Sequence, residues 1–166
     1  RVRAGVAYMP ADRSTTALVK SLSIGENLML RDSASPAYAE GPFLSSQKLE
    51  TNARRLMQQY DIRAPGPATP AARLSGGNQQ KIVVARELDR KPALLIAHQA
   101  AWGLDPGATR FVLERVLALR EEGAAIVYFS SELEEVAYDR QPKGARRPGF
   151  NTYFHLGVCL HKPEDY

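Results

Sequence analysis

The sequence predicts an α/β fold built on a mostly parallel sheet. Two continuous apolar runs of strand length, residues 93–97 and 124–129, have the character of strands buried on both faces. The segment 2–8 is also apolar and β-favouring, and it meets Pro10, which suits a short strand that leaves the sheet into a loop. Helical patterns follow the apolar runs, and this alternation indicates parallel strands joined by right-handed crossovers.

The carboxyl ends of these predicted strands are the places where a ligand is expected. In open parallel sheets, ligands gather at the edge where the strands end. That edge corresponds here to the neighbourhoods of Ala11, His98 and Ser130.

Length and composition fit one compact domain. The chain has 166 residues, of which 44% are hydrophobic and 24% are charged. The net charge of +4 is neither gathered on one helix face nor interleaved with aromatic residues, so we expect no nucleic-acid partner. The single cysteine, Cys159, excludes an internal disulfide and fits a reducing cytoplasm, and the three histidines form no zinc-ligand pattern, so no metal site is expected.

The first half of the chain is expected to be largely helical after the first strand. Ser23 and Glu26 have the spacing of a capping box, so a short helix begins there. Residues 32–42 lack any period and are predicted to be a surface connection, and 47–60 is predicted to be an amphipathic helix. The buried face of that helix comprises Leu49, Ala53, Leu56, Met57 and Tyr60. Residues 64–72 contain three prolines and are predicted to be a stiff linker.

The second half alternates more regularly. A helix is predicted over 78–88, a turn over 103–107, and a further helix that ends at Gly123. Ser131 and Glu134 repeat the capping-box spacing, so another helix is expected from Glu132. The last segment is predicted to contain a loop over 141–149 and a strand over 150–160.

The stretch Leu74-Ser75-Gly76-Gly77-Asn78-Gln79-Gln80-Lys81 is the strongest candidate for a binding site. Adjacent glycines allow the backbone to approach a ligand, and the helix behind them directs free N–H groups and a positive dipole end to the same place. This arrangement predicts an anion site, and more narrowly a phosphate site. Ser75 can cap the helix or bind a phosphate oxygen, and the alternative is a loop-to-helix junction without a ligand.

The order of these motifs resembles the ATP-binding cassette of the ABC transporter family. The resemblance rests on Ser-Leu-Ser-Ile-Gly-Glu-Asn-Leu from Ser21, on Leu-Ser-Gly-Gly-Asn-Gln-Gln-Lys from Leu74, on Gly-Leu-Asp from Gly103 and on Ser-Ser-Glu-Leu-Glu-Glu-Val from Ser130. The chain is most similar to the second, C-terminal cassette of tandem ATPase subunits that import simple sugars and nucleosides. The resemblance covers residues 1–140 and implies a partial P-loop-type ABC fold. Within it, residues 24–72 would be the inserted helical subdomain and linker. Residues 141–166 show no resemblance to the family.

This resemblance implies roles for particular residues. In ABC ATPases two cassettes close head to tail around ATP and Mg²⁺, so Ser75, Gly76, Gly77 and Asn78 would bind the γ-phosphate of an ATP held by a partner cassette. Asp105 matches the loop that contacts the partner. The helical subdomain would dock on membrane permease domains, which places the protein in the cytoplasm, peripheral to the inner face of the plasma membrane.

Several departures from the family pattern concern the hydrolytic half of the site. A cassette's own phosphate loop requires Gly-x-x-x-x-Gly-Lys-Ser/Thr, and no Gly-Lys pair occurs here. His98 and Gln99 stand where the family has two acidic residues. The Mg²⁺-binding carboxylate and the carboxylate that acts as general base are therefore missing. Gln99 thus occupies a degenerate catalytic position, and Ser131 occupies the position of a histidine that contacts the γ-phosphate. We expect the chain alone to be inactive as an ATPase.

The leading hypothesis is a signature-donating part of an importer ATPase that completes an ATP site for a partner. Because the sequence begins with Arg1 rather than Met, the chain is expected to be cut from a longer one. One alternative is a catalytically silent interaction module or gene remnant. Another is a non-transport ABC ATPase of the DNA-repair type, although such proteins insert long coiled coils and no sustained heptads occur here.

Overall fold

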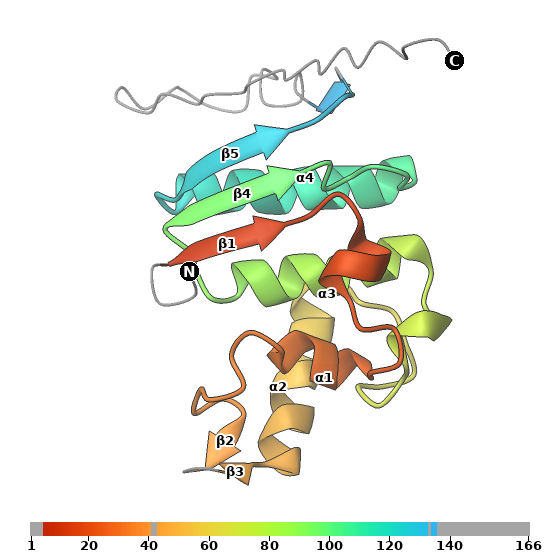
Figure 1. The fold of residues 1–166 in the computed structure, drawn as a ribbon, viewed down its shortest axis with the longest axis vertical. Coiled ribbons are helices and arrows are strands. Elements are labelled where there is room, and N and C mark those ends of the chain that lie inside the picture. The colour runs from red at the N-terminus through yellow and green to blue at the C-terminus, as the bar shows by residue number, and fades with distance from the viewer. Residues whose placement is uncertain (1–4, 41–42, 133, 136–166) are drawn as a thin grey trace, which may run out of the picture.

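The computed structural model describes residues 5–40, 43–132 and 134–135. A three-stranded parallel sheet forms its centre, in the order β1 (Val6–Met9), β4 (Leu94–His98) and β5 (Ala125–Phe129). The three predicted strands and their parallel arrangement are therefore confirmed, with starts that lie one to four residues later than expected. The arrowheads in Figure 1 all point the same way, so the three carboxyl ends share one edge of the sheet.

Two long helices accompany the sheet. α3 (Gly76–Leu88) packs against β1, and α4 (Pro106–Glu121) packs against β5. The two helices also contact each other. Both begin at the edge where the strands end and run back along the sheet (Figure 1), so their N-termini are directed to the place where a ligand is expected.

A smaller helical part lies on the far side of α3 from the sheet (Figure 1). It contains α1 (Ile24–Met29) and α2 (Ser46–Gln59), and α1 contacts both α2 and α3. The predicted capping box is confirmed, because Ser23 Oγ accepts from Glu26 N while Glu26 Oε2 accepts from Ser23 N at 2.8 Å. α2 begins one residue earlier than predicted, at Ser46, with Ser45 as its cap.

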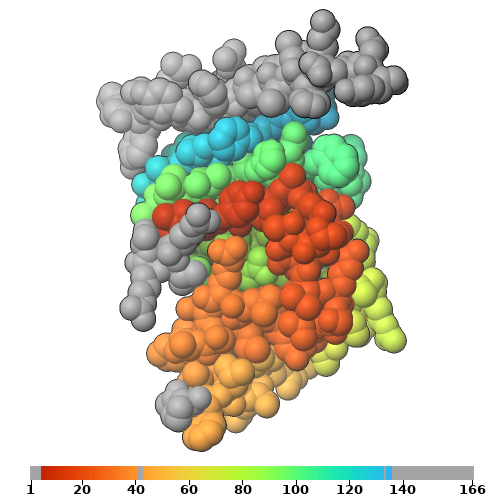
Figure 2. Space-filling model, viewed as in Figure 1, coloured from red at the N-terminus to blue at the C-terminus, as the bar shows by residue number. Residues whose placement is uncertain are grey.

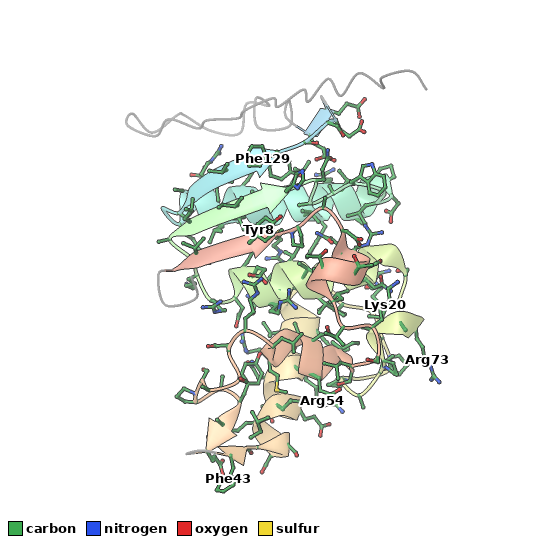
Figure 3. All side chains as sticks on the ribbon, in the orientation of Figure 1. Tyr8, Lys20, Phe43, Arg54, Arg73 and Phe129 are labelled. Carbon is green, nitrogen blue, oxygen red and sulfur yellow. The ribbon has the colours of Figure 1, made fainter. Side chains whose placement is uncertain are left out.

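The segment 32–42 differs from the expected irregular connection. It contains turns and then β2 (Ala39–Glu40), which pairs antiparallel with β3 (Phe43–Leu44). The sequence did not predict the pairing of β2 with β3, because two residues on each strand are too few to show a hydrophobic period. Figure 3 shows the exposed Phe43 at the end of the molecule farthest from the sheet.

The loop predicted after the first strand leads into a single turn of π-helix, Arg13–Ala17. Asp12 caps this turn by accepting from the backbone N–H groups of Ser14 and Thr15. A hydrogen bond from the Thr15 hydroxyl, followed by these two backbone bonds, holds the pKa of Asp12 below its ordinary value. In Figure 2 the residues after β1, in red, lie between the sheet-bearing part and the orange helical part.

The hydrophobic core is continuous from the sheet through α3 into the helical part. Residues such as Met9, Ile24, Leu56 and Ile82 are all essentially inaccessible to solvent. Glu87 of α3 is also fully buried, and its Oε1 accepts from Arg31 Nε and from Arg86 Nε, each at 3.0 Å. This ionic contact attaches the end of α1 to α3 inside the core.

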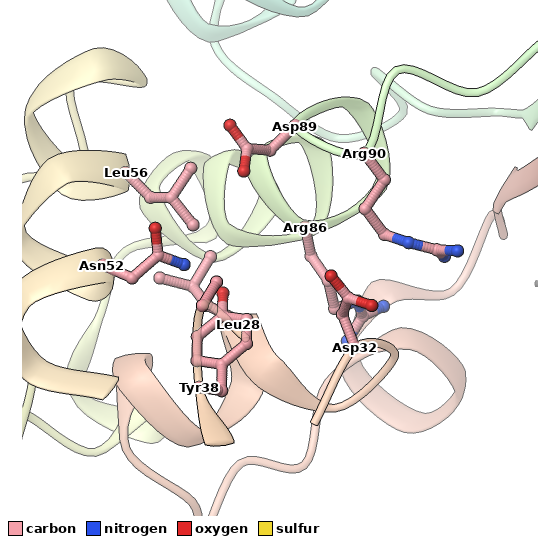
Figure 4. Close-up of a pocket in the computed structure, with 9 residues that line it drawn as sticks. Leu28, Asp32, Tyr38, Asn52, Leu56, Arg86, Asp89 and Arg90 are labelled. Atoms are coloured by element: carbon pink, nitrogen blue, oxygen red, sulfur yellow. The ribbon is translucent and has the colours of Figure 1, made fainter. Parts of the chain in front are cut away.

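The small cavity in Figure 4 lies between α1, α2 and α3. Its lining includes Leu28, Tyr38, Asn52, Leu56 and Arg86, and its volume is about 30 Å³. That volume is enough for about one or two water molecules and far too small for a nucleotide.

Some predicted elements lie outside the described residues. The helix expected from Glu132 does not include that residue, because Glu132 is not helical whereas Glu134 and Glu135 are. The loop over 141–149 and the strand over 150–160 lie outside the described part, as does the whole segment 141–166. Within the described part, no helix is long and apolar enough to cross a membrane.

Candidate functional site at the start of α3

Ser75 is the N-cap of α3, so the helix begins at Gly76 rather than at the predicted residue 78. Its backbone is extended, and its Oγ accepts from the backbone N–H of Asn78 at 3.4 Å and from Asn78 Nδ2 at 3.2 Å. Gly76 and Gly77 occupy the first two helical positions, where backbone N–H groups have no partner within the helix. The exposed Ser75 hydroxyl therefore lies beside two N–H donors and the positive end of the helix dipole.

The side chain of Asn78 is fixed at both ends of its amide. Its Oδ1 accepts from the backbone N–H of Arg63 at 2.9 Å, and its Nδ2 donates to Ser75. The first bond attaches the start of α3 to the segment that leaves the helical part. The Asn78 amide is thus engaged with protein groups on both sides.

Gly76 lies against the guanidinium group of Arg13. A Cβ placed on Gly76 would lie 2.7 Å from Arg13 Nη2, which is closer than nonbonded contact permits. Arg13 Nη1 donates to the carbonyl oxygen of Trp102 at 3.0 Å, and the Arg13 Nε is buried without a partner among the described residues. One arginine therefore brings together the turn after β1, the start of α3 and the loop after β4.

Gly77 faces the start of α4. A Cβ on Gly77 would lie 3.2 Å from Ala108 Cβ and 3.6 Å from Asp105 Oδ2. Asp105 is the N-cap of α4, because its Oδ1 accepts from Ala108 N at 3.0 Å. The second glycine thus permits two helix N-termini to lie side by side, and it places the predicted residue Asp105 next to the signature.

Gln99 and Ser131 come together at the ends of β4 and β5. Gln99 Oε1 accepts from Ser131 Oγ at 3.2 Å and from Ser131 N at 3.4 Å. The backbone of Gln99 has a φ of +53°, and its N–H donates to the carbonyl oxygen of Phe129 at 2.8 Å. His98 is exposed, with its ring edge-on to that of Phe129 at 6.1 Å. The amide of Gln99 can orient a water molecule, but no ionisable group stands at this position to accept a proton.

A buried carboxylate holds the chain after β5 in place. Glu135 Oε2 accepts from the Tyr128 hydroxyl and from Ser130 Oγ, each at 2.8 Å, and Ser130 Oγ in turn accepts from Glu132 N. Burial, followed by the nearby Glu135 charge, raises the pKa of the Tyr128 hydroxyl. These bonds fix the segment that carries Ser131.

Two cations connect the elements around the start of α3. Lys81 Nζ donates to the backbone carbonyl oxygen of Asp61 at 2.7 Å and to the Asp61 carboxylate at 2.6 Å. The hydrogen bond to the carboxylate lowers the pKa of Asp61. The same Nζ lies 4.9 Å from the centre of the Phe111 ring. Arg115 of α4 lies 5.2 Å from the ring centres of both Phe111 and Tyr60. Arg115 Nη2 also donates to the carbonyl oxygen of Gln59 at 2.8 Å. Lys81 therefore attaches α3 to Asp61 and to α4, and Arg115 attaches α4 to the end of α2.

Mg²⁺ does not fit the residues present around Gln99. In the described ranges, no group of three or more His, Cys, Asp or Glu side chains could hold a metal ion. The side-chain carbonyl oxygen of Gln99, which is a possible Mg²⁺ ligand, already accepts a hydrogen bond from Ser131. No step is assigned to a metal ion held by these residues.

The predicted site residues thus form two groups. Ser75, Gly76, Gly77 and Asn78 lie together with Asp105 beside them, and Gln99 lies with Ser131. Sequence reasoning missed Arg13, the Arg63 N–H and Glu135 as their supports. Paired glycines indicate that another group packs closely against the backbone, but the sequence does not show that this group is Arg13. The Arg63 N–H is a backbone group, so no residue type indicates its role.

Comparisons with known proteins give consistent results. No family model matches the sequence. The nucleoside import ATP-binding protein NupA of Lactococcus lactis subsp. cremoris is 37% identical over 164 residues, covering 93% of this chain and 32% of that protein. The guanosine import ATP-binding protein NupO of Bacillus subtilis is 42% identical over 132 residues, covering 80% of the chain and 26% of that protein. The ribose import ATP-binding protein RbsA of Shouchella clausii is 36% identical, with the same coverage.

The chain therefore spans about a third or less of the length of the curated relatives it matches. The alignment with the Lactococcus protein includes part of the segment after residue 140, for which no resemblance was expected. Among solved structures, the dimeric ATP-binding cassette MJ0796 superposes with a TM-score of 0.63 at 19% identity, covering 80% of this chain and 54% of that one. An ATP-binding subunit of an ABC transporter superposes with a TM-score of 0.58 at 26% identity, covering 82% and 52%.

Proposed function

We propose a function from the premise that this chain is a homologue of nucleoside and sugar import ATP-binding proteins and has an ABC ATPase-like fold. Its role is to donate the Ser75–Asn78 signature to an ATP held by a second cassette, and thereby to complete a composite ATP site. The observation that carries this proposal is the exposed N-terminus of α3, where the Ser75 hydroxyl lies beside the N–H groups of two glycines. These donors match the acceptor oxygens of a phosphate.

The partner cassette supplies what this chain lacks. Because no Gly-Lys pair occurs in the sequence and Gln99 stands where a carboxylate is expected, the phosphate loop, the Mg²⁺ ligands and the general base belong to the other cassette. Asp105, beside Gly77 at the start of α4, contacts that cassette across the closed interface.

In this proposal ATP-driven closure of the composite site powers import of a simple sugar or a nucleoside. The helical part, within residues 24–72, docks on membrane permease domains, so the protein is cytoplasmic and peripheral to the membrane. Residues 1–140 form the cassette portion. The names of the relatives support this class of substrate, since they include guanosine and ribose importers.

The test is ATP-dependent association. The chain is mixed with an import cassette that has an intact Gly-x-x-x-x-Gly-Lys-Ser/Thr loop, and binding is measured by analytical ultracentrifugation with and without ATP. We expect association only with ATP, and we expect Ser75→Arg to abolish it, because the long cation fills the space of the phosphate.

Ser45→Arg is the matched control. Ser45 caps α2 as Ser75 caps α3, accepting from a backbone N–H three residues on at the same 3.4 Å. It should leave the association unchanged. Equal losses in both variants, or association that ignores ATP, would contradict the proposal.

A further inference from the structure

We infer that Asn78 is a positioning residue. It fixes the Ser75 hydroxyl as a hydrogen-bond donor toward phosphate, and it does not contact the phosphate itself. This inference rests on the proposed function and revises one part of the sequence-based expectation, in which Asn78 joined Ser75 as a direct ligand.

The first step concerns the orientation of the Asn78 amide. Its two ends look alike in shape, but one is an acceptor and the other a double donor. The Arg63 backbone N–H can only donate, so the atom 2.9 Å from it must be Oδ1. The Nδ2 end is consequently the one directed at Ser75, at 3.2 Å.

The second step concerns the Ser75 oxygen. A hydroxyl oxygen has two acceptor positions and one donor hydrogen. Asn78 occupies both acceptor positions, one through Nδ2 at 3.2 Å and one through its backbone N–H at 3.4 Å. The hydroxyl hydrogen must therefore be directed away from Asn78, and no described residue accepts it.

The third step concerns what a ligand would meet. The outward hydrogen of Ser75 joins the unpartnered N–H groups at the first positions of α3, and together they form a set of donors. Such a set favours a group that only accepts hydrogen bonds, as a fully ionised phosphate does, over one that must donate. The fixed amide thus makes the site selective for an anion.

A double-mutant cycle on ATP-dependent association tests this inference. Ser75→Ala removes the donor and should weaken the association at least about tenfold, since a hydrogen bond to a charged group is lost. Asn78→Ala should weaken it roughly threefold, because the freed hydroxyl can occupy three staggered positions. In the Ser75→Ala background the Asn78→Ala change should have almost no effect, since the group through which Asn78 acts is gone.

Asn78→Asp gives a second and larger signal. A carboxylate oxygen in place of Nδ2 would accept the Ser75 hydrogen and turn it away from the ligand, so the loss should exceed that of Asn78→Ala. Asn78→Gln is the alternative should Asn78→Ala fail to fold, because a longer amide cannot make both bonds from this position. Ser45→Ala, which removes the equivalent cap of α2, controls for a general loss of helix stability.

The outcomes separate the two proposals. If Asn78→Ala weakens the association threefold in both backgrounds, Asn78 binds the phosphate directly and the inference is wrong while the proposed function stands. If the unmodified chain shows no ATP-dependent association, the proposed function fails and the inference fails with it. Thermal melting of each variant, followed by circular dichroism, shows whether a loss of binding reflects a loss of folding.

Discussion

Ser131 donates its hydroxyl hydrogen to the side-chain oxygen of Gln99 over 3.2 Å, and its backbone N–H reaches the same oxygen. This pair closes the ends of β4 and β5 where a working ATPase would hold its base. Because the amide oxygen is engaged and carries no charge, Gln99 can position a water molecule but cannot deprotonate it.

A polypeptide of these 166 residues should therefore release phosphate from ATP no faster than buffer alone. Gln99→Ala should leave that background unchanged, because there is no proton acceptor to remove. A colorimetric phosphate assay on the purified chain measures both. Clear turnover that disappears in Gln99→Ala would show that the glutamine is catalytic after all.

Gly76→Ala should lower the free energy of unfolding by about 1–2 kcal/mol, because the new Cβ displaces Arg13 from the Trp102 carbonyl oxygen. In an Arg13→Ala background the same change should be neutral or slightly stabilising, since alanine is the better helix former. Urea denaturation of the four proteins gives the coupling. Gly66→Ala is the control, because nothing lies within 4 Å of the added atom. Additive losses would mean that Arg13 and Gly76 act independently.

Arg115→Ala should destabilise the protein by about 1–2 kcal/mol, since it removes two cation–π contacts and the hydrogen bond to the Gln59 carbonyl oxygen. Arg115→Lys should recover part of the loss, because lysine keeps the charge but not the planar stacking. Arg54→Ala, which breaks only an exposed pair with Glu50, should cost at most about 0.5 kcal/mol. Equal thermal shifts for Arg115→Ala and Arg54→Ala would argue against a brace between α2 and α4.

The capping box of α1 should make stability depend on pH in the acid range. Hydrogen bonds from Ser23 hold the pKa of Glu26 below its ordinary 4.5. A lowered pKa means that this stabilisation is present above about pH 5 and is lost as the pH falls through the folded-state pKa. Glu26→Gln, which does not titrate, should lose less stability than the unmodified protein between about pH 6 and pH 3.5 in urea titrations. Parallel losses in the two proteins would contradict this assignment.

The sequence predicted the sheet, its helices and the start of the candidate site because each has a local signal. Continuous apolar runs marked β4 and β5, the serine and glutamate spacing marked α1, and paired glycines marked the start of α3. The pairing of β2 with β3 had no such signal, because two residues on each side set no period.

The groups that support the site could not be predicted in the same way. Arg13 reaches Gly76 from 63 positions earlier in the chain, and the Arg63 N–H that orients Asn78 is a backbone group, which carries no sequence signal. Local sequence patterns therefore predict the position of the hydrogen-bond donors at the start of α3, whereas long-range contacts determine the orientation of the Ser75 hydroxyl.

α3 extends from the candidate site at Ser75 to the helical part, so a tilt of this helix would couple the two. Its first residue follows Ser75, while near its last turn Glu87 binds Arg31 and Asp89 binds Arg55 of the helical part. Thirteen residues make a rod about 20 Å long, so a tilt of about 5° at the far end moves Ser75 by about 1.7 Å. That displacement is enough to break the 2.9 Å bond between Asn78 and the backbone N–H of Arg63, which does not move with α3. A force on α1 and α2 would thus change the position of Asn78 and, through it, the orientation of the Ser75 hydroxyl.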